Sequence, residues 1–65
     1  MKKIESYYVS RSTGDKITIR TIKRPHLSGD SYIIFRGGWR VAEYKTAASV
    51  RRYIIENDCH QVESH

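Results

Sequence analysis

Apolar and polar residues alternate along residues 16–23, which read Lys-Ile-Thr-Ile-Arg-Thr-Ile-Lys. A period of two predicts a β-strand with one solvated face. The alternation breaks at Ile22, which predicts a bulge or the end of the strand there. Residues 6–11 are rich in tyrosine and valine and predict a preceding strand, and residues 12–15 supply turn-forming side chains between the two.

The pairing of these two strands decides which side chains face the core. We expect Arg11 to lie opposite Lys16, which places Tyr8, Ile17 and Ile19 on the inner face. The opposite face then carries Tyr7, Val9, Arg11, Lys16, Thr18 and Arg20.

The strongest local signal is a hairpin, in which residues 31–36 and 39–44 flank Gly37 and Gly38. A two-residue glycine turn of type I′ or II′ is typical of such a connection. Pairing Arg36 with Trp39 gives two faces, and both contain apolar groups. The cleaner core face holds Tyr32, Ile34, Trp39 and Val41, and the other holds Ile33, Phe35, Arg40, Ala42 and Tyr44.

Residues 47–57 predict a helix of about three turns. Thr46 is the expected N-cap, because its hydroxyl can accept from the exposed amides of the first turn. Ala47, Val50 and Ile54 follow the spacing of one helix side, and Val50 and Ile54 are expected to face the sheet. Asn57 is expected to end the helix in a left-handed conformation.

The remaining segments complete the predicted fold. Residues 24–30 contain the single proline and predict a loop, whereas residues 1–5 and 58–65 are polar ends that we expect to fray. The sequence therefore predicts one small domain over residues 1–65. Its fold class is α+β, with a four-stranded antiparallel meander and one C-terminal helix packed on one face.

Composition narrows the classes of protein that fit. The chain has 65 residues, a net charge of +5 and one cysteine, so an intrachain disulfide framework is excluded. Mean hydropathy is −0.64, and we find no apolar run near the roughly 18 residues that span a bilayer. We therefore expect a cytoplasmic protein. Residues 1–52 hold all twelve basic residues and four acidic ones, whereas residues 53–65 hold three acidic residues and no Lys or Arg.

A strongly cationic body attracts polyanions, and the face away from the helix is expected to interleave cations with aromatic rings. Such a surface suits DNA or RNA, because cations neutralise phosphates and rings stack on unpaired bases. An antiparallel sheet can alternatively enter the major groove of a duplex. Proteins of this kind are often accessory regulators encoded by phages and mobile elements. The candidate nucleic-acid-binding residues are Arg11, Lys16, Arg20, Lys23, Arg24, Phe35, Arg40 and Tyr44.

A second interpretation stays open beside the first. The same face, or a sheet edge, suits a protein-interaction module or an inhibitor that docks on an acidic protein surface. Phe35 and Tyr44 would then form the centre of the contact. A homodimer that covers the open face is also physically reasonable for a chain of this size, and membrane binding is not favoured.

Enzymatic chemistry and metal binding have little support in the residue spacing. His26, Cys59, His60 and His65 are suitable zinc ligands by type, but they contain no second short-spaced pair. Cys59 falls in the expected frayed end, which lacks the walls that exclude water from a nucleophile. We expect no cofactor, no metal and no enzymatic activity. The single Arg36-Gly37-Gly38 triplet is read as a hairpin turn rather than an RNA-binding tail.

The stretch from Trp39 to Tyr53 resembles the last strand and helix of plant AP2-type domains and of phage integrase arm-binding domains. The resemblance implies a sheet backed by a helix, with strand residues that read the major groove of DNA. It covers about a quarter of the chain and does not establish membership. Ala48 and Ser49 stand where AP2-type domains usually have acidic residues, and this chain has an extra predicted strand ahead.

Overall fold

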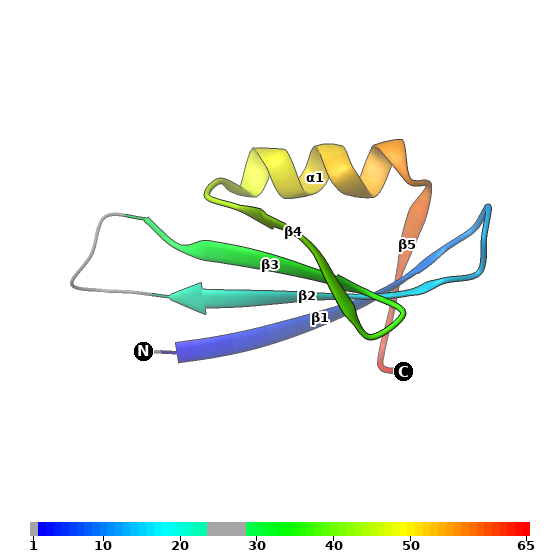
Figure 1. Cartoon of the computed structure of the whole chain (residues 1–65), viewed down its shortest axis with the longest axis horizontal. Coiled ribbons are helices and arrows are strands. Elements are labelled where there is room, and N and C mark those ends of the chain that lie inside the picture. The colour runs from blue at the N-terminus through cyan, green and yellow to red at the C-terminus, as the bar shows by residue number, and fades with distance from the viewer. Residues whose placement is uncertain (1, 24–28) are drawn as a thin grey trace.

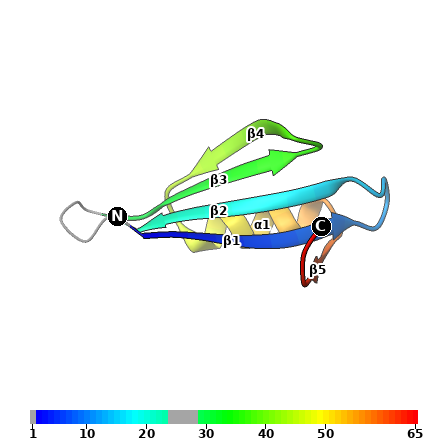
Figure 2. The ribbon, with the colours of Figure 1, turned by 90° about the horizontal axis from the view of Figure 1, so that it is seen from below.

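The computed structural model describes residues 2–23 and 29–65. Over these residues the chain forms five strands and one helix, all strands being antiparallel in one sheet. The strand order is β4-β3-β2-β1-β5, and α1 lies across one face of the sheet (Figures 1 and 2). The elements are β1 (Lys2–Ser10), β2 (Lys16–Lys23), β3 (Ser31–Arg36), β4 (Trp39–Tyr44), α1 (Ala47–Glu56) and β5 (Cys59–Val62). The predicted α+β class is confirmed. Most of the predicted 24–30 loop lies outside the described residues.

The core lies between the sheet and α1. Ile17, Ile19, Ile34 and Val50 are buried, and half-buried side chains from the strands and the helix pack around them. These surrounding side chains are Tyr8, Tyr32, Ala42, Tyr44, Tyr53, Ile54 and Cys59. The predicted inward orientation of Tyr8, Ile17 and Ile19 is therefore correct.

The pairing of β1 with β2 differs from the prediction by two residues. Lys16 lies opposite Val9 instead of Arg11, and Tyr8 lies opposite Ile17. The loop between β1 and β2 is longer than a tight turn. Its two ends are joined by a hydrogen bond, which the Ser10 amide donates to the Asp15 carbonyl at 3.0 Å. A shift of two keeps every side chain on its face, since side chains alternate with a period of two. The faces were thus predicted correctly although the register was wrong.

A β-bulge reverses the predicted faces of β4 from Ala42 onwards. Arg36 pairs with Trp39 as predicted, but Phe35 lies opposite Arg40 and Ile34 lies opposite Ala42, so Val41 is the extra residue. Ala42 and Tyr44 therefore pack against the core, and the placement of Tyr44 on the open face was wrong. The predicted core positions Trp39 and Val41 are 77% and 50% exposed.

The part of β4 that follows the bulge contacts the helix. Lys45 and Thr46 join β4 to α1, so the end of β4 lies beside the helix. Ala42 is small and half-buried, and the Tyr44 ring lies 6.3 Å from that of Tyr53. The predicted N-cap is confirmed, because Thr46 accepts from the amide of Ser49 at 3.2 Å.

Both ends that were expected to fray contain strand structure. Residues 2–5 belong to β1, and Cys59–Val62 form β5, which pairs with the end of β1 from Tyr7 to Ser10. The helix is therefore followed by a strand and is not the last element. The chain reverses at Asp58, whose φ of 50° is left-handed, whereas Asn57 has a φ of −100°. The predicted left-handed residue was wrong by one position. Pairing with the free edge of β1 orders this segment despite its polar sequence.

Within the described residues, no helix combines the length and apolar content needed to cross a membrane.

Candidate nucleic-acid interface

The sheet face opposite α1 carries a row of side chains that crosses the strands. Tyr7 lies opposite Thr18, and Thr18 lies opposite Phe35, so two rings flank one small residue. Val62 and Arg40 extend the row at its ends. Among the described elements, none covers this row as α1 covers the other face (Figure 2).

An open hollow of about 400 Å³ lies over this row. Thr18 is the small residue of the central strand, and the flanking aromatic side chains rise on both sides of it. The lining residues are Glu5, Tyr7, Lys16, Thr18, Arg20, Phe35, Gly37, Gly38 and His65. The hollow thus combines aromatic rings with two cationic side chains.

Phe35 is held by a neighbouring ion pair. The guanidinium carbon of Arg20 lies 4.8 Å from the centre of the Phe35 ring, within the range of a cation–π contact. The Glu5 carboxylate accepts from Arg20 Nε at 3.0 Å and orients the guanidinium. Arg20 therefore lies along the face of the sheet, and Phe35 presents a fixed ring to the hollow.

The hairpin turn keeps one side of the hollow open. Gly37 and Gly38 have φ values of +61° and +87°, as a type I′ turn requires at both positions. The Gly37 amide donates to the Lys16 carbonyl at 3.0 Å, which ties the turn to β2. Glycine at both positions leaves no side chain beside Phe35.

His65 completes the aromatic lining and was missed by the sequence reasoning. After β5 the chain crosses to the face opposite α1, where its end lies below the sheet in Figure 1. The Nε2–H of His65 donates to the Ile17 carbonyl at 3.1 Å. Its ring lies 5.1 Å from the Tyr7 ring in an edge-on arrangement with an interplanar angle of 70°. Because residues 58–65 were expected to fray, the sequence did not indicate that His65 lies in the hollow.

The predicted site residues are only partly brought together. Lys16, Arg20 and Phe35 line the hollow, and Arg40 lies beside Phe35 in the row. The others lie elsewhere: Arg11 is exposed in the β1–β2 turn, Lys23 ends β2, and Tyr44 packs on the opposite face. Arg24 lies outside the described residues.

Ion pairs reduce the free positive charge of this face. Arg40 Nη2 lies 2.7 Å from a Glu43 carboxylate oxygen, and Arg20 Nη2 lies 3.0 Å from a Glu5 carboxylate oxygen. Lys16 is exposed, and over the described part of the chain no carboxylate lies within ion-pair distance of it. Of the two cations that line the hollow, Lys16 is therefore the one without an ion-pair partner among the described residues.

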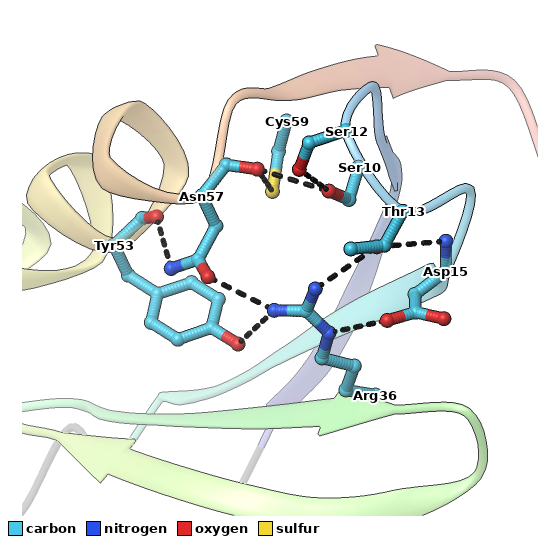
Figure 3. A network of polar contacts seen from close by, with 8 residues as sticks. All are labelled: Ser10, Ser12, Thr13, Asp15, Arg36, Tyr53, Asn57 and Cys59. Carbon is cyan, nitrogen blue, oxygen red and sulfur yellow. Dashed lines mark hydrogen bonds and ion pairs between the residues drawn. The ribbon is translucent and has the colours of Figure 1, made fainter.

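A second polar cluster lies on the helix side and joins three segments (Figure 3). Arg36 Nε donates to Asp15 at 2.9 Å, and its Nη1 donates to Asn57 at 2.9 Å and to the Tyr53 hydroxyl at 3.4 Å. Its Nη2 donates to Thr13 at 3.1 Å. The guanidinium thus binds the β1–β2 turn and the end of α1 at once.

This Arg36 cluster is structural rather than ligand-binding. The hydrogen bonds that Arg36 donates to Tyr53 and Asp15 raise the pKa of Arg36, and the hydrogen bonds that Asp15 accepts from Arg36 and Thr13 lower the pKa of Asp15. These donors and acceptors are engaged with one another within the chain, so they orient the helix end and the turn.

Cys59 lies beside this cluster, half-buried in β5. Burial raises the pKa of its thiol above the ordinary value of 9.0, with Asp58 adding to the rise and Arg36 opposing it. The thiol is therefore protonated at neutral pH, the opposite of an activated nucleophile. Among residues 2–23 and 29–65, no group of three or more His, Cys, Asp or Glu side chains is arranged to hold a metal ion.

No protein family matches this chain, and no match was found among curated proteins or solved structures. The likeness to AP2-type and integrase arm-binding domains therefore rests on residues 39–53 alone.

Proposed function

We propose that the protein is a non-enzymatic binding protein whose open sheet face, defined by the row Tyr7, Thr18 and Phe35 with Lys16 and Arg20, binds nucleic acid. The supporting observation is the pair of rings that flank Thr18 beside two cations on a face opposite the helix. Rings stack on bases, and cations neutralise phosphates.

The fixed ring of Phe35 favours this function over simple solubility. A surface that only keeps a protein soluble needs dispersed charges, and it gains nothing from aromatic groups held in a hollow. Here Glu5 orients Arg20, and Arg20 covers one side of Phe35. Such preorganisation lowers the entropy that binding must overcome.

The test is a fluorescence anisotropy titration with short labelled oligonucleotides, single-stranded and duplex, at low salt. We expect Lys16→Gln and Phe35→Leu to weaken binding. Their matched controls are Arg52→Gln, an exposed cation on α1, and Trp39→Ala, an exposed ring outside the hollow. Absence of binding to either form of nucleic acid at low salt would refute the proposal.

A protein partner is the second candidate, favoured by one observation. Trp39 is 77% exposed and Val41 is 50% exposed on β4, an edge strand of the sheet. Exposed tryptophan is typical of interaction hot spots, and an edge strand can pair with a peptide. Under this reading Trp39→Ala removes the activity and Phe35→Leu does not. Binding would also depend weakly on salt, unlike binding to a duplex backbone.

A further inference from the structure

We infer that the hollow over Thr18 takes one unpaired nucleobase, so that the ligand is single-stranded nucleic acid rather than a duplex. This inference rests on the proposed function and specifies its ligand class. It follows from the width of the hollow, the engagement of the arginines and the position of His65.

The spacing of the strands sets the width of the hollow. Tyr7 and Phe35 are separated by the one strand that carries Thr18, and neighbouring strands lie about 4.8 Å apart, so their backbones are about 10 Å apart. The His65 ring lies inside this span, because its Nε2–H donates to the Ile17 carbonyl of β2 and the ring contacts Tyr7. A flat ring stacked on one other ring needs about 3.5 Å, the contact distance between carbon atoms. The remaining space beside Phe35 therefore holds no more than one base.

The two walls of the hollow come from different parts of the chain. Phe35 forms one wall together with the glycines of the β3–β4 turn, and Tyr7 with His65 forms the other. Thr18 lies between them on β2 and adds little height. A base that enters from above meets ring faces or edges on both sides.

A duplex cannot use this arrangement. Its base faces are covered by neighbouring base pairs, and only base edges are accessible in the grooves. Arginine is the commonest reader of guanine edges, but Arg20 lies along Phe35 and is paired with Glu5, and Arg40 is paired with Glu43. Stacking on an unstacked base is the contact that these side chains still offer.

The charge of the face agrees with a ligand held mainly by stacking. Lys16 lines the hollow and can contact a phosphate next to the stacked base. Each phosphate contact with a single strand gives a slope of about −0.7 in a plot of log affinity against log salt. One or two contacts therefore predict a shallow slope of about −0.7 to −1.4.

The experiment compares three ligands of equal length with the full chain: a single-stranded oligonucleotide, a duplex, and an oligonucleotide with one run of abasic sites. We expect the single strand to bind at least about tenfold more tightly than the abasic strand, which keeps the phosphates and lacks the bases. The duplex is expected to bind more weakly than the single strand. Equal binding of the single strand and the abasic strand would overturn the inference.

Variants and spectra locate the base. Phe35→Leu keeps an apolar side chain without a π-system and is expected to weaken binding of the single strand about tenfold, whereas Trp39→Ala leaves it unchanged. Stacking also shifts the ring-proton resonances of His65 and Tyr7 upfield when the single strand is added. An unchanged affinity for Phe35→Leu, in a variant whose spectrum shows it folded, would overturn the inference.

The outcomes separate this inference from the proposed function. Binding of the duplex as tightly as the single strand, with resonance changes on the open face, overturns the unpaired-base inference and leaves nucleic-acid binding standing. No binding of any of the three ligands overturns both.

Discussion

The Arg36 guanidinium and the Asp15 carboxylate join β3 to the β1–β2 turn through a 2.9 Å contact between Nε and Oδ2. The two residues are 21 positions apart in the chain. Arg36 also donates to Asn57, so the same side chain links the turn to the end of α1. The Arg36 cluster therefore fixes the helix end over the sheet.

Replacing Arg36 with methionine keeps an apolar stem and removes every donor. We expect the free energy of unfolding to fall by about 1–3 kcal/mol, because Asp15 and Asn57 lose a charged partner. Urea unfolding followed by circular dichroism measures this change. Arg51→Met, at an exposed position on α1, is the control and should change stability by less than about 0.5 kcal/mol. Equal losses in the two variants would contradict a structural role for the cluster.

Acid should weaken the fold through Asp15. Hydrogen bonds from Arg36 and Thr13 hold the pKa of Asp15 below its ordinary value of 3.8. Because the folded pKa is lower than the unfolded one, the ionised carboxylate stabilises the fold above the unfolded pKa. This stabilisation is lost as the pH falls through the folded value. The measurement is the urea midpoint between about pH 6 and about pH 2.5. Asp15→Asn should be less stable than the wild type at pH 6, and the difference should shrink on acidification.

Gly38 should resist substitution by ordinary residues. Its φ of +87° is unfavourable for side chains with a Cβ, although a Cβ there would meet no atom within 4 Å. We expect Gly38→Ala to destabilise the fold by about 1 kcal/mol through backbone strain alone. Gly38→Asn should cost less, since asparagine tolerates the left-handed region. Thermal unfolding of the two variants checks this prediction. Equal losses of stability in Gly38→Ala and Gly38→Asn would show that the positive φ at this position is not the cause.

The thiol of Cys59 should react slowly in the folded chain. Its pKa is raised by burial, so the thiolate fraction at pH 8 is smaller than for an exposed cysteine. We expect alkylation by iodoacetamide at pH 8 to be slower in the native protein than in the same chain unfolded in urea. Mass spectrometry follows the reaction, and equal rates would mean that β5 leaves the thiol open.

Local patterns were sufficient to identify the first four strands and the helix, but not β5. Period-two alternation identified β2, the glycine pair identified the β3–β4 turn, and Thr46 marked the start of α1. The wrong pairing of Arg11 with Lys16 did not change which side chains were predicted to face the core, because a register shift of two residues preserves the faces.

Long-range contacts decided what the patterns could not. The bulge at Val41 was not predicted, and it places Tyr44 against the core instead of in the candidate site. β5 forms because β1 offers unpaired backbone groups from Tyr7 to Ser10, which a polar tail does not reveal. His65 reached the hollow as a consequence of that pairing.

The bulge gives β4 a constraint on length as well as on composition. The additional residue, Val41, determines on which face of the sheet each later side chain of β4 lies, from Ala42 onwards. Deleting Val41 would turn Ala42 and Tyr44 towards solvent or force the strand to slip against β3, even though no buried side chain would have been removed. In this strand, loss of a single codon would be more damaging than most changes of residue type.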